Sequence, residues 1–296
     1  MIRVAFVTSA KIPNLTADDC LCADALRRCG TTVDAVRWDD SAARWTEYDT
    51  VVLRSTWDYH LRPAEFRAWA ERCERDGVRL WNPGPLVRWN MDKTYLRELS
   101  GNGVAIPPCL WIERGRDVNL AAALREQGWD RAVLKPTISA SAYRTYAVSR
   151  EDTAELQAVL PEVVGDSGAM LQRFIPQIEQ PGEWSLVFFH DEFSHAVLKT
   201  PRAGDFRVQN ELGGRAVKAQ PPSSFVAQAR NVLATLREPT LYARVDACEV
   251  GGQFVLMELE LIEPDLFLRT SAEAPDRFAD AILARVKRPS QNPMML

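Results

Sequence analysis

Short apolar runs alternate with amphipathic stretches through the first 88 residues. Four runs rich in valine, isoleucine and leucine predict buried strands, at 2–9, 31–38, 49–56 and 78–83. Two stretches between them have helical periodicity, at 16–30 and 63–77, with Thr16 as a helix N-cap, Pro63 in the first turn and a glycine closing each helix. Strands that alternate with helices form an open, largely parallel sheet. Ligands of such sheets bind beyond the carboxyl ends of the strands.

The remaining chain mixes helices with strands that return as hairpins. Helical periodicity predicts helices at 90–99, 118–128, 151–164, 223–237 and 274–287. Single strands are predicted at 107–113, 131–136 and 169–175, another after a small-residue loop in 137–148, and hairpins at 183–200 and 241–262. We expect a long loop rich in charge and glycine at 201–216, and frayed residues at 289–296. The fold class predicted is an α/β domain over 1–88, with a parallel sheet, followed by two α+β subdomains over 89–172 and 173–296.

The hairpin at 241–262 carries an unusual set of charges. Alternate residues of a strand share a face, so Glu258 and Glu260 stand together while their neighbours are apolar. A simple two-residue glycine turn would set Asp246, on the partner strand, opposite an apolar residue. Burying the apolar faces together requires the charged faces to coincide as well. We therefore predict an odd-length loop or a β-bulge in this hairpin.

Three carboxylates on one face of a partly buried sheet need to be neutralised. Hard divalent cations such as Mg²⁺ bind carboxylate oxygens and bridge them to substrate phosphates. Asp246, Glu258 and Glu260 are therefore the candidate metal ligands, with Arg244 beside them. The alternative is an exposed strand face balanced by arginine and lysine. A magnesium site would in turn suggest a nucleotide.

Lysine is scarce in this chain, with six lysines among the 36 lysines and arginines, so each lysine at the end of an apolar strand stands out. Lys135 and Lys199 end such strands, and Lys93 lies in "WNMDKTYL". The alternative for any single lysine is a solvated surface position. The loop after Lys135 offers hydroxyls and backbone N–H groups for phosphates. It has no glycine, and the chain contains neither a P-loop nor a dinucleotide fingerprint.

A polar cluster follows the third predicted strand of the N-terminal domain. The segment "RSTWDYH" offers groups that suit a small zwitterion, namely Arg54, Ser55, Thr56, Asp58 and Tyr59. Arg54 is expected to pair with a carboxylate and Asp58 with an ammonium group. The alternative is a loop whose aromatic residues simply pack.

The composition excludes several classes of protein. With 46% hydrophobic and 26% charged residues the chain is an ordinary folded protein, and its net charge of −4 provides no basic field for nucleic acid. Six scattered cysteines without a C-x-x-C pair argue against a zinc site and a disulfide framework. The first apolar run is too short for a secretory signal, and none reaches the ~20 residues of a membrane span. We expect a cytoplasmic protein with a small amino-acid-like substrate and no membrane partner, with a homodimer as one possible assembly.

An ordered series of segments between residues 88 and 287 resembles the ATP-grasp superfamily. The series is "MDKTYL", "VLKP", a small-residue loop, "MLQRFI", "GEWSLVFF", "AVLKTP", "FRVQNELGG", "YARVDA" and "MELELIEP". In that family ATP lies between two α+β subdomains and phosphorylates a carboxylate, and a nitrogen nucleophile then displaces the phosphate. The resemblance implies a ligase that forms a C–N bond and uses ATP and Mg²⁺.

The resemblance also implies roles for individual residues, by position in the series. Residues on the nucleotide would be Lys93, Lys135, Ser139, Ser141, Gln172, Arg173, Phe174, Ile175 and Glu183, the four from 172 to 175 forming the linker that reads adenine. Residues facing the transferred phosphate and the substrate would be Lys199, Arg207, Asn210 and Arg244. The metal ligands would be Asp246, Glu258 and Glu260.

Two segments depart from the family pattern. The usual glycine-rich phosphate lid is "ISASAYRTY" here, which leaves the flexibility of the lid open. The usual Glu-x-Asn is Glu258-x-Glu260, whose extra charge should favour tight magnesium binding.

Three segments, "RSTWDYH", "WNMDKTYL" and "ELIEPDLF", are most similar to a small ATP-grasp group that includes the D-cycloserine-forming cyclo-ligase. That similarity implies phosphorylation of the carboxylate of O-ureido-D-serine, ring closure by its ureido nitrogen and loss of the carbamoyl group. One alternative is an intermolecular amino-acid or peptide ligase resembling glutathione synthetase. The other is a nucleotide-binding protein or small-molecule kinase that forms no C–N bond.

Overall fold

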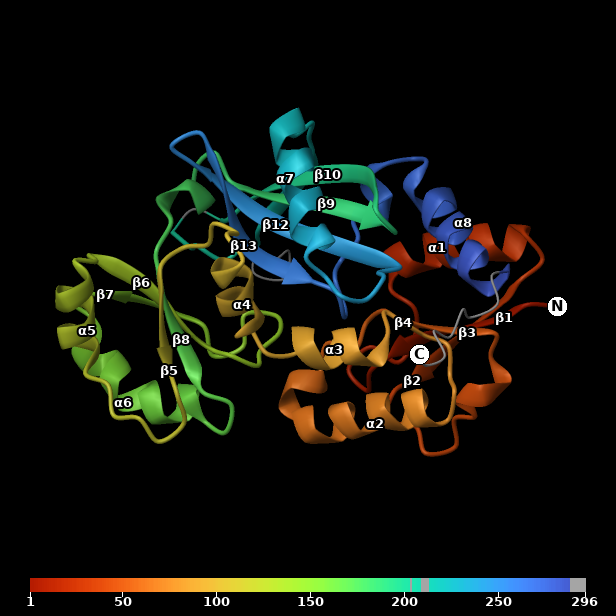
Figure 1. The fold of residues 1–296 in the computed structure, drawn as a ribbon, viewed down its shortest axis with the longest axis horizontal. Coiled ribbons are helices and arrows are strands. Elements are labelled where there is room, and N and C mark those ends of the chain that lie inside the picture. Colours follow the sequence, from red (N-terminus) through yellow and green to blue (C-terminus); the bar gives the residue numbers. More distant parts are fainter. Residues whose placement is uncertain (203, 209–212, 288–296) are drawn as a thin grey trace, which may run out of the picture.

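The computed structural model describes residues 1–202, 204–208 and 213–287. It begins with a parallel four-stranded sheet in the order β2-β1-β3-β4. These strands span Arg3–Thr8 (β1), Thr32–Arg37 (β2), Thr50–Leu53 (β3) and Leu80–Trp81 (β4). Helices α1 (Ala17–Arg28) and α2 (Pro63–Arg75) connect them (Figure 1). The predicted parallel sheet is confirmed.

The start of α1 is capped as the sequence predicts. The Thr16 hydroxyl accepts a hydrogen bond from the Asp19 N–H at 3.0 Å, which satisfies one of the free donors of the first turn. The last helix, α8 (Ala274–Lys287), packs against α1, as Figure 1 shows. Its Phe278 lies in one hydrophobic core with Leu26 of α1 and Tyr242 of the C-terminal sheet. The C-terminal helix therefore ties the first sheet to the last one.

The single helix predicted at 90–99 is confirmed only from Tyr95 onward. Two short helices occupy this part of the chain, α3 (Gly84–Asn90) and α4 (Tyr95–Gly101). The break between them is held by Asp92, whose carboxylate accepts from the Thr94 N–H at 2.9 Å, and by the Lys93 N–H, which donates to the Thr137 carbonyl at 2.8 Å. A turn held by a side chain and by a contact with a distant loop has no signature in local periodicity.

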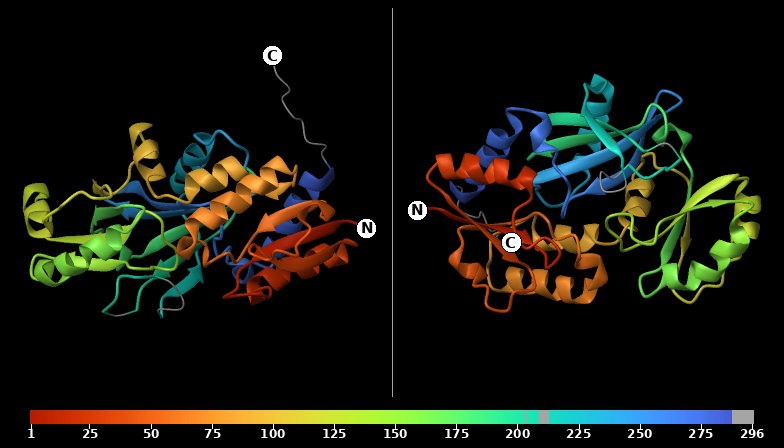
Figure 2. Two further views of the ribbon diagram at one scale, coloured as in Figure 1. Left: turned by 90° about the horizontal axis from the view of Figure 1, so that it is seen from below. Right: turned by 180° about the vertical axis from the view of Figure 1, so that it is seen from behind.

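A second sheet, antiparallel and in the order β5-β8-β6-β7, forms the central subdomain. Its strands are Cys109–Ile112 (β5), Arg131–Pro136 (β6), Tyr146–Ser149 (β7) and Ala169–Arg173 (β8). Helices α5 (Leu120–Gln127) and α6 (Thr153–Val164) pack their apolar residues onto it. Figure 2 shows this subdomain at the end of the molecule opposite the N-terminal sheet.

The third sheet has the order β11-β10-β9-β12-β13 and is also antiparallel. Its strands are Glu183–Phe189 (β9), Glu192–Thr200 (β10), Arg215–Lys218 (β11), Tyr242–Val250 (β12) and Gln253–Glu260 (β13). Strand β11 lies at the end of the segment predicted to be a loop, so that prediction is wrong there. Helix α7 (Ser223–Ala234) adds Phe225 and Val232 to the core of this sheet. Both α+β units are confirmed, while the predicted boundaries at residues 88 and 172 remain predictions.

The predicted β-bulge is present between β12 and β13. Beside the glycine turn Val250 pairs with Gln253, but the register shifts after Ala247, so that Asp246 pairs with Glu258 and Arg244 with Glu260. The bulge therefore brings the charged residues of the two strands onto one face, as the apolar pattern requires.

Backbone N–H and C=O groups on the outer edge of β13 form hydrogen bonds with side chains instead of with another strand. Asn90 donates to the Leu259 carbonyl at 2.8 Å and accepts from the Leu261 N–H at 2.9 Å. The Tyr95 hydroxyl accepts from the Leu259 N–H at 3.0 Å. An unpaired edge would attract other chains, and these contacts also clamp the break between α3 and α4 against the strand.

Short 3₁₀ helices lie at Trp45–Glu47, Tyr59–Leu61, Pro176–Ile178 and Leu268–Thr270. No helix in the described ranges is both long and apolar enough to span a bilayer.

Candidate active site

A cavity opens where the central subdomain, the C-terminal sheet and the loop after β3 meet. Its walls come from β6, the small-residue loop after β6, the charged face of β12 and β13, and Trp57 and Tyr59 of the N-terminal domain. It is the place where the residues predicted to bind phosphate and metal converge, together with one of the predicted substrate residues. Residues predicted for these roles that line it are Lys93, Lys135, Ser139, Ser141, Gln172, Glu183, Lys199, Arg207, Arg244, Asp246, Glu258, Glu260 and Tyr59.

Lys93 is held against Glu258 by the break between α3 and α4. Its Nζ lies 2.9 Å from Glu258 Oε1 and donates to the Ser139 carbonyl at 2.8 Å. Burial by itself would lower the pKa of Lys93, but the Glu258 carboxylate, helped by Glu263, outweighs it and raises that pKa. The ammonium is therefore charged, and it links β13 to the small-residue loop.

Lys135 differs from Lys93 in having no counter-ion. It lies in β6 and lines the cavity, and its ammonium makes no hydrogen bond or ion pair with any residue in the described ranges. Burial lowers the pKa of Lys135, although the Glu258 charge acts in the opposite direction. Because a half-buried cation without a partner is unfavourable, this position is suited to an anionic ligand.

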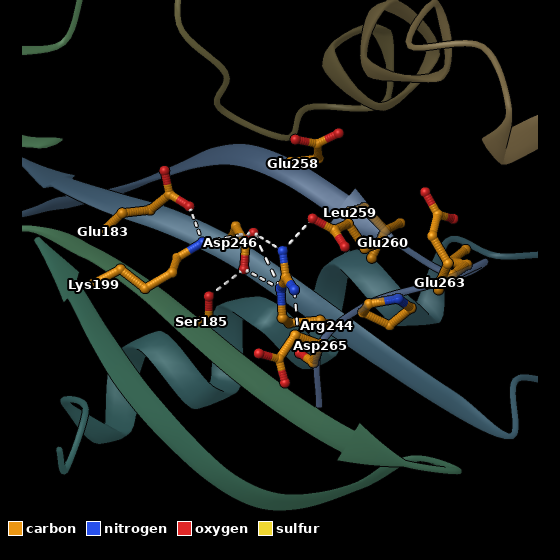
Figure 3. A network of polar contacts seen from close by, with 12 residues as sticks. Glu183, Ser185, Lys199, Arg244, Asp246, Glu258, Leu259, Glu260, Glu263 and Asp265 are labelled. Atoms are coloured by element: carbon orange, nitrogen blue, oxygen red, sulfur yellow. Dashed lines mark hydrogen bonds and ion pairs between the residues drawn. The ribbon is translucent and has the colours of Figure 1, made fainter. Parts of the chain in front are cut away.

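A buried ion network runs along the floor of the cavity (Figure 3). Lys199 Nζ lies 2.6 Å from Glu183 Oε1 and 3.1 Å from Asp246 Oδ2. Asp246 also accepts from the Ser185 hydroxyl at 2.6 Å and pairs with Arg244 Nη2 at 2.9 Å. Burial would raise the pKa of Asp246, but Arg244 and Lys199 together hold it well below its ordinary value. Asp246 is therefore an ionised carboxylate, only 2% exposed.

Glu260 completes the network through a short ion pair with the Arg244 guanidinium. Burial, reinforced by the charges of Asp246 and Glu258, raises the pKa of Glu260 to about 7 even though Arg244 opposes the shift. The carboxylates of β12 and β13 therefore carry more negative charge than Arg244 neutralises.

The candidate metal ligands lie on one face but are engaged by protein cations. Arg244 holds Asp246 and Glu260, and Lys93 holds Glu258. In the described part of the chain, no three histidine, cysteine or acidic side chains already form a metal cage. The donors are nonetheless the hard oxygens that Mg²⁺ prefers, and Asp246 and Glu258 are directly paired across the two strands. The residue set fits a magnesium ion that enters with a polyphosphate.

The small-residue loop after β6 takes a conformation that glycine usually provides. Ser141, Ala142 and Arg144 have φ values of +51°, +55° and +49°, in the left-handed region that L-residues rarely adopt. Ile138 and Ala140 pack against the core of the N-terminal domain, and the Tyr143 ring lies 5.0 Å from the ring of His60. The loop that the resemblance identifies as the phosphate lid is therefore anchored on the N-terminal domain.

The predicted adenine linker is only partly open to a ligand. Gln172 lines the cavity, but the N–H groups of Arg173 and Phe174 donate to the carbonyls of Pro108 and Arg131. The Phe174 ring lies under the Arg131 guanidinium at 3.8 Å, and Ile175 is buried. Backbone recognition of adenine at Arg173 and Phe174 would therefore rest on their carbonyl groups.

Arg207 reaches the cavity while paired with Asp205 at 2.8 Å. Hydrogen bonds from Arg207 outweigh burial and lower the pKa of Asp205 well below its ordinary value. Asn210, the other candidate in this segment, lies outside the described residues.

The expected substrate clamp at Arg54 needs correction. The Arg54 Nε donates to Asp19 at 2.7 Å and its Nη2 to the Pro264 carbonyl at 3.0 Å, and the guanidinium is 3% exposed. Asp58 is likewise committed, because it accepts from the indole N–H of Trp38 at 2.8 Å.

The two hydroxyls after Arg54 are also away from the cavity wall. Ser55 and Thr56 are buried, and their hydroxyls find no hydrogen-bond partner among the residues that the structure describes. Of the five residues predicted to grip the substrate, Tyr59 alone lines the cavity. The charged side chain of Arg54 at the end of β3 thus stabilises the contact between the N-terminal domain and the segment that follows β13.

Several residues of the cavity wall have no role in the sequence analysis, among them Trp57, Glu263 and Asp265. The available signal was the continuation of the acidic run: "ELIEPD" carries two further carboxylates directly beyond the strand. Strand periodicity ends at Glu260, so spacing gives no indication of where these side chains point.

Comparison with known proteins agrees with this geometry. The family model of the N-terminal domain of D-cycloserine synthetase DcsG matches residues 4–82. The cycloserine biosynthesis protein DcsG of Streptomyces lavendulae is 32% identical over 284 residues, which cover 89% of this chain and 92% of that protein. The chain belongs to the DcsG family of ATP-grasp ligases.

Solved structures support the same assignment. The crystal structure of D-cycloserine synthetase DcsG matches with a TM-score of 0.84 at 29% identity, covering 96% of this chain and all of that one. The D-alanine–D-alanine ligase of Bacillus anthracis matches with a TM-score of 0.70 at 14% identity over 97% of both chains, which shows a shared fold. The ATP-grasp architecture predicted from the sequence is confirmed. For the DcsG family this fold implies ATP and Mg²⁺, and the cavity described above lies between its two α+β subdomains.

Proposed function

We propose that the protein is an ATP-dependent cyclo-ligase that closes O-ureido-D-serine to D-cycloserine. The observation that carries the proposal is Lys135, which lines the same cavity as the Lys93–Glu258 pair and has no hydrogen-bonded or ion-paired partner among the residues that the structure describes. Similarity to DcsG over nearly the whole chain supports the choice of substrate.

The cations of the cavity have separable roles in this reaction. Lys135 holds ATP phosphates through its unused N–H donors, and Lys93 contributes the third donor of its ammonium, since two are already used. Arg207 and Arg244 face the substrate carboxylate and the phosphoryl group that moves. Catalysis in phosphoryl transfer is mostly positioning and electrostatic stabilisation, which is what a set of fixed cations provides.

The bond changes follow from this placement. A carboxylate oxygen of the substrate attacks the γ-phosphorus of ATP and ADP leaves, which gives an acyl phosphate. The ureido nitrogen bonded to oxygen then attacks the acyl carbon and gives up its proton, inorganic phosphate leaves and the five-membered ring closes. Water attacks the carbamoyl carbon and the bond from this carbon to the ring nitrogen breaks. The ring nitrogen takes up a proton, and the carbamate that leaves decomposes to carbon dioxide and ammonia. Lys199 pairs with both Asp246 and Glu183 and holds the two carboxylates in place.

Asp246, Glu258 and Glu260 would hold Mg²⁺, which, when bound, neutralises phosphate charge during transfer. For that purpose Lys93 and Arg244 must release part of their hold on these carboxylates. The two cations thus occupy these carboxylates until the nucleotide arrives.

The test is ATP turnover with O-ureido-D-serine as the sole second substrate, with products identified by mass spectrometry. We expect phosphate release together with D-cycloserine, and loss of both in Glu258→Gln. Lys218→Ala, a change of an exposed lysine on β11, serves as the matched control and should behave like the wild type.

Each other outcome overturns the proposal in a different way. A requirement for a separate amine would identify an intermolecular ligase, in line with the 29% identity to the glutathione synthetase of Prochlorococcus marinus. A stable phosphorylated product would identify a small-molecule kinase.

A further inference from the structure

A fourth carboxylate, Glu263, lines the cavity just beyond the end of β13. In Figure 3 its side chain points to the same side of the strand as Glu258. Its carboxylate makes no hydrogen bond or ion pair with a residue in the described ranges. Its backbone, in contrast, is fixed, because the indole N–H of Trp57 donates to the Glu263 carbonyl at 2.9 Å.

Among the described residues, Glu263 is the member of this acidic group that forms no ion pair with a protein cation, although Lys93 and Arg244 act on it from a greater distance. Lys93 neutralises Glu258, and Arg244 neutralises Glu260. Burial, followed by the charge of Glu260, raises the pKa of Glu263 to about 8 even though the charges of Lys93 and Arg244 oppose the shift. A carboxylate in such a position is stabilised in its ionised form by a cation supplied from outside the chain.

The surroundings of Glu263 favour an organic ammonium group as that cation. Trp57 and Tyr59 line the same cavity and come from the N-terminal domain. Aromatic rings attract ammonium groups through their negative faces. The cavity therefore has cationic walls at Lys135 and Arg207 for phosphate and carboxylate groups, and an anionic wall with aromatic neighbours at Glu263.

We propose that Glu263 binds the α-ammonium group of the amino-acid substrate and selects for molecules that carry one. This inference rests on the proposed function and adds the group that recognises the amine. It also has a chemical consequence. An α-amine held in its protonated form has no lone pair, so it cannot attack the acyl phosphate, and the ureido nitrogen is left as the nucleophile.

Glu263→Gln removes the charge while keeping the shape, so it is the variant that tests the proposal. Binding is measured by calorimetry with Mg²⁺ and a non-hydrolysable ATP analogue present, using O-ureido-D-serine and its analogue without the α-amino group. The wild type should prefer the amino compound by about 10²-fold, because removing one partner of a buried charge pair leaves the other unpaired. Glu263→Gln should lose most of this preference, and affinity for the ATP analogue should not change.

Two further variants complete the design. Glu263→Asp restores the charge and should recover part of the preference, which a merely structural role would not predict. Glu249→Gln, an exposed glutamate on β12, is the matched control and should keep the full preference. An unchanged preference in Glu263→Gln would overturn the inference, and so would a wild type that binds neither compound or both equally.

Failure of this inference is distinguishable from failure of the proposed function. If the wild type makes D-cycloserine and Glu263→Gln keeps the preference, the inference alone fails. If the wild type makes no D-cycloserine but shows a preference that depends on Glu263, the proposed cyclisation fails and the ammonium subsite stands.

Discussion

Charged side chains cluster beyond strand ends in two regions of this molecule. In one region these side chains form ion pairs with each other, and in the other some of them do not. Beyond β3, Arg54 and Asp19 are 3% and 2% exposed and lie 2.7 Å apart. In the cavity beside β6 and β13, the side chains of Lys135 and Glu263 have no hydrogen-bonded or ion-paired partner among the described residues.

This difference distinguishes charged side chains that stabilise the fold from charged side chains that are available to bind a ligand. A buried ion needs a partner, or it shifts its pKa or destabilises the folded state. At β3 the chain supplies the partner itself, from α1 and from the segment after β13. In the cavity no described residue supplies this partner charge. A ligand of opposite charge therefore gains the most binding free energy there.

The largest expected effect is a loss of folding stability when the buried ion pair of the N-terminal domain is broken. Asp19→Asn should lower the free energy of unfolding by about 3 kcal/mol, because it leaves the Arg54 charge buried and unpaired. Denaturant unfolding measures this. The matched control is Asp24→Asn in the same helix, whose partner Arg27 and own side chain are about half exposed, so it should cost less than about 1 kcal/mol. Equal losses in the two variants would remove the distinction drawn above.

The cavity should respond in the opposite manner. Lys135→Ala should reduce turnover by roughly 10²–10³-fold, the usual cost of one contact to a developing charge, with little change in unfolding free energy because no protein partner is lost. Steady-state phosphate release and a denaturation curve on the same preparation test both halves. A stability loss as large as that of Asp19→Asn would place Lys135 with the structural charges.

His60 extends the comparison, because it lies in the 3₁₀ helix that follows β3 and its ring contacts the Tyr143 ring of the small-residue loop. Burial, followed by the charge of Lys93, lowers the pKa of His60 to about 4. The unfolded chain takes up a proton near pH 6.5, whereas the folded chain does so only near the lower value, so the stability contributed by neutral His60 is lost as the pH falls between them.

The corresponding variant is His60→Phe, which keeps the ring contact but cannot titrate. Between pH 7 and pH 4 the unfolding free energy of both proteins should decrease. The decrease should be about 1–2 kcal/mol smaller in His60→Phe than in the wild type. Thermal or denaturant unfolding across this range measures the difference. Parallel pH profiles for the two proteins would contradict the assigned environment.

Much of the fold follows from the sequence, because periodicity and caps are local. Thr16, Pro63 and the alternation of strands and helices define the N-terminal sheet. The bulge between β12 and β13 also follows, since apolar parity demands it once both strands are recognised. In contrast, the break at Lys93 depends on the carbonyl of Thr137, some forty residues away, and local patterns contain no trace of it.

The sequence predicts which residues belong to the site better than it predicts which residues form ion pairs with them. Spacing places Asp246, Glu258 and Glu260 on one face, as observed. It does not show that Lys93 and Arg244 already neutralise them, or that Arg54 is committed to Asp19, because ion pairs between distant elements depend on tertiary packing. Glu263 was missed because it lies past the end of a strand, where alternation no longer fixes direction.

The most direct test of the central claim is the affinity of Lys135→Ala for a non-hydrolysable ATP analogue with Mg²⁺, measured by calorimetry beside Lys218→Ala. If the free charge of Lys135 is kept for nucleotide phosphates, Lys135→Ala should bind at least ~30-fold more weakly than the wild type, while Lys218→Ala binds normally. Equal affinity in all three proteins would contradict the claim that unpaired charge marks this site.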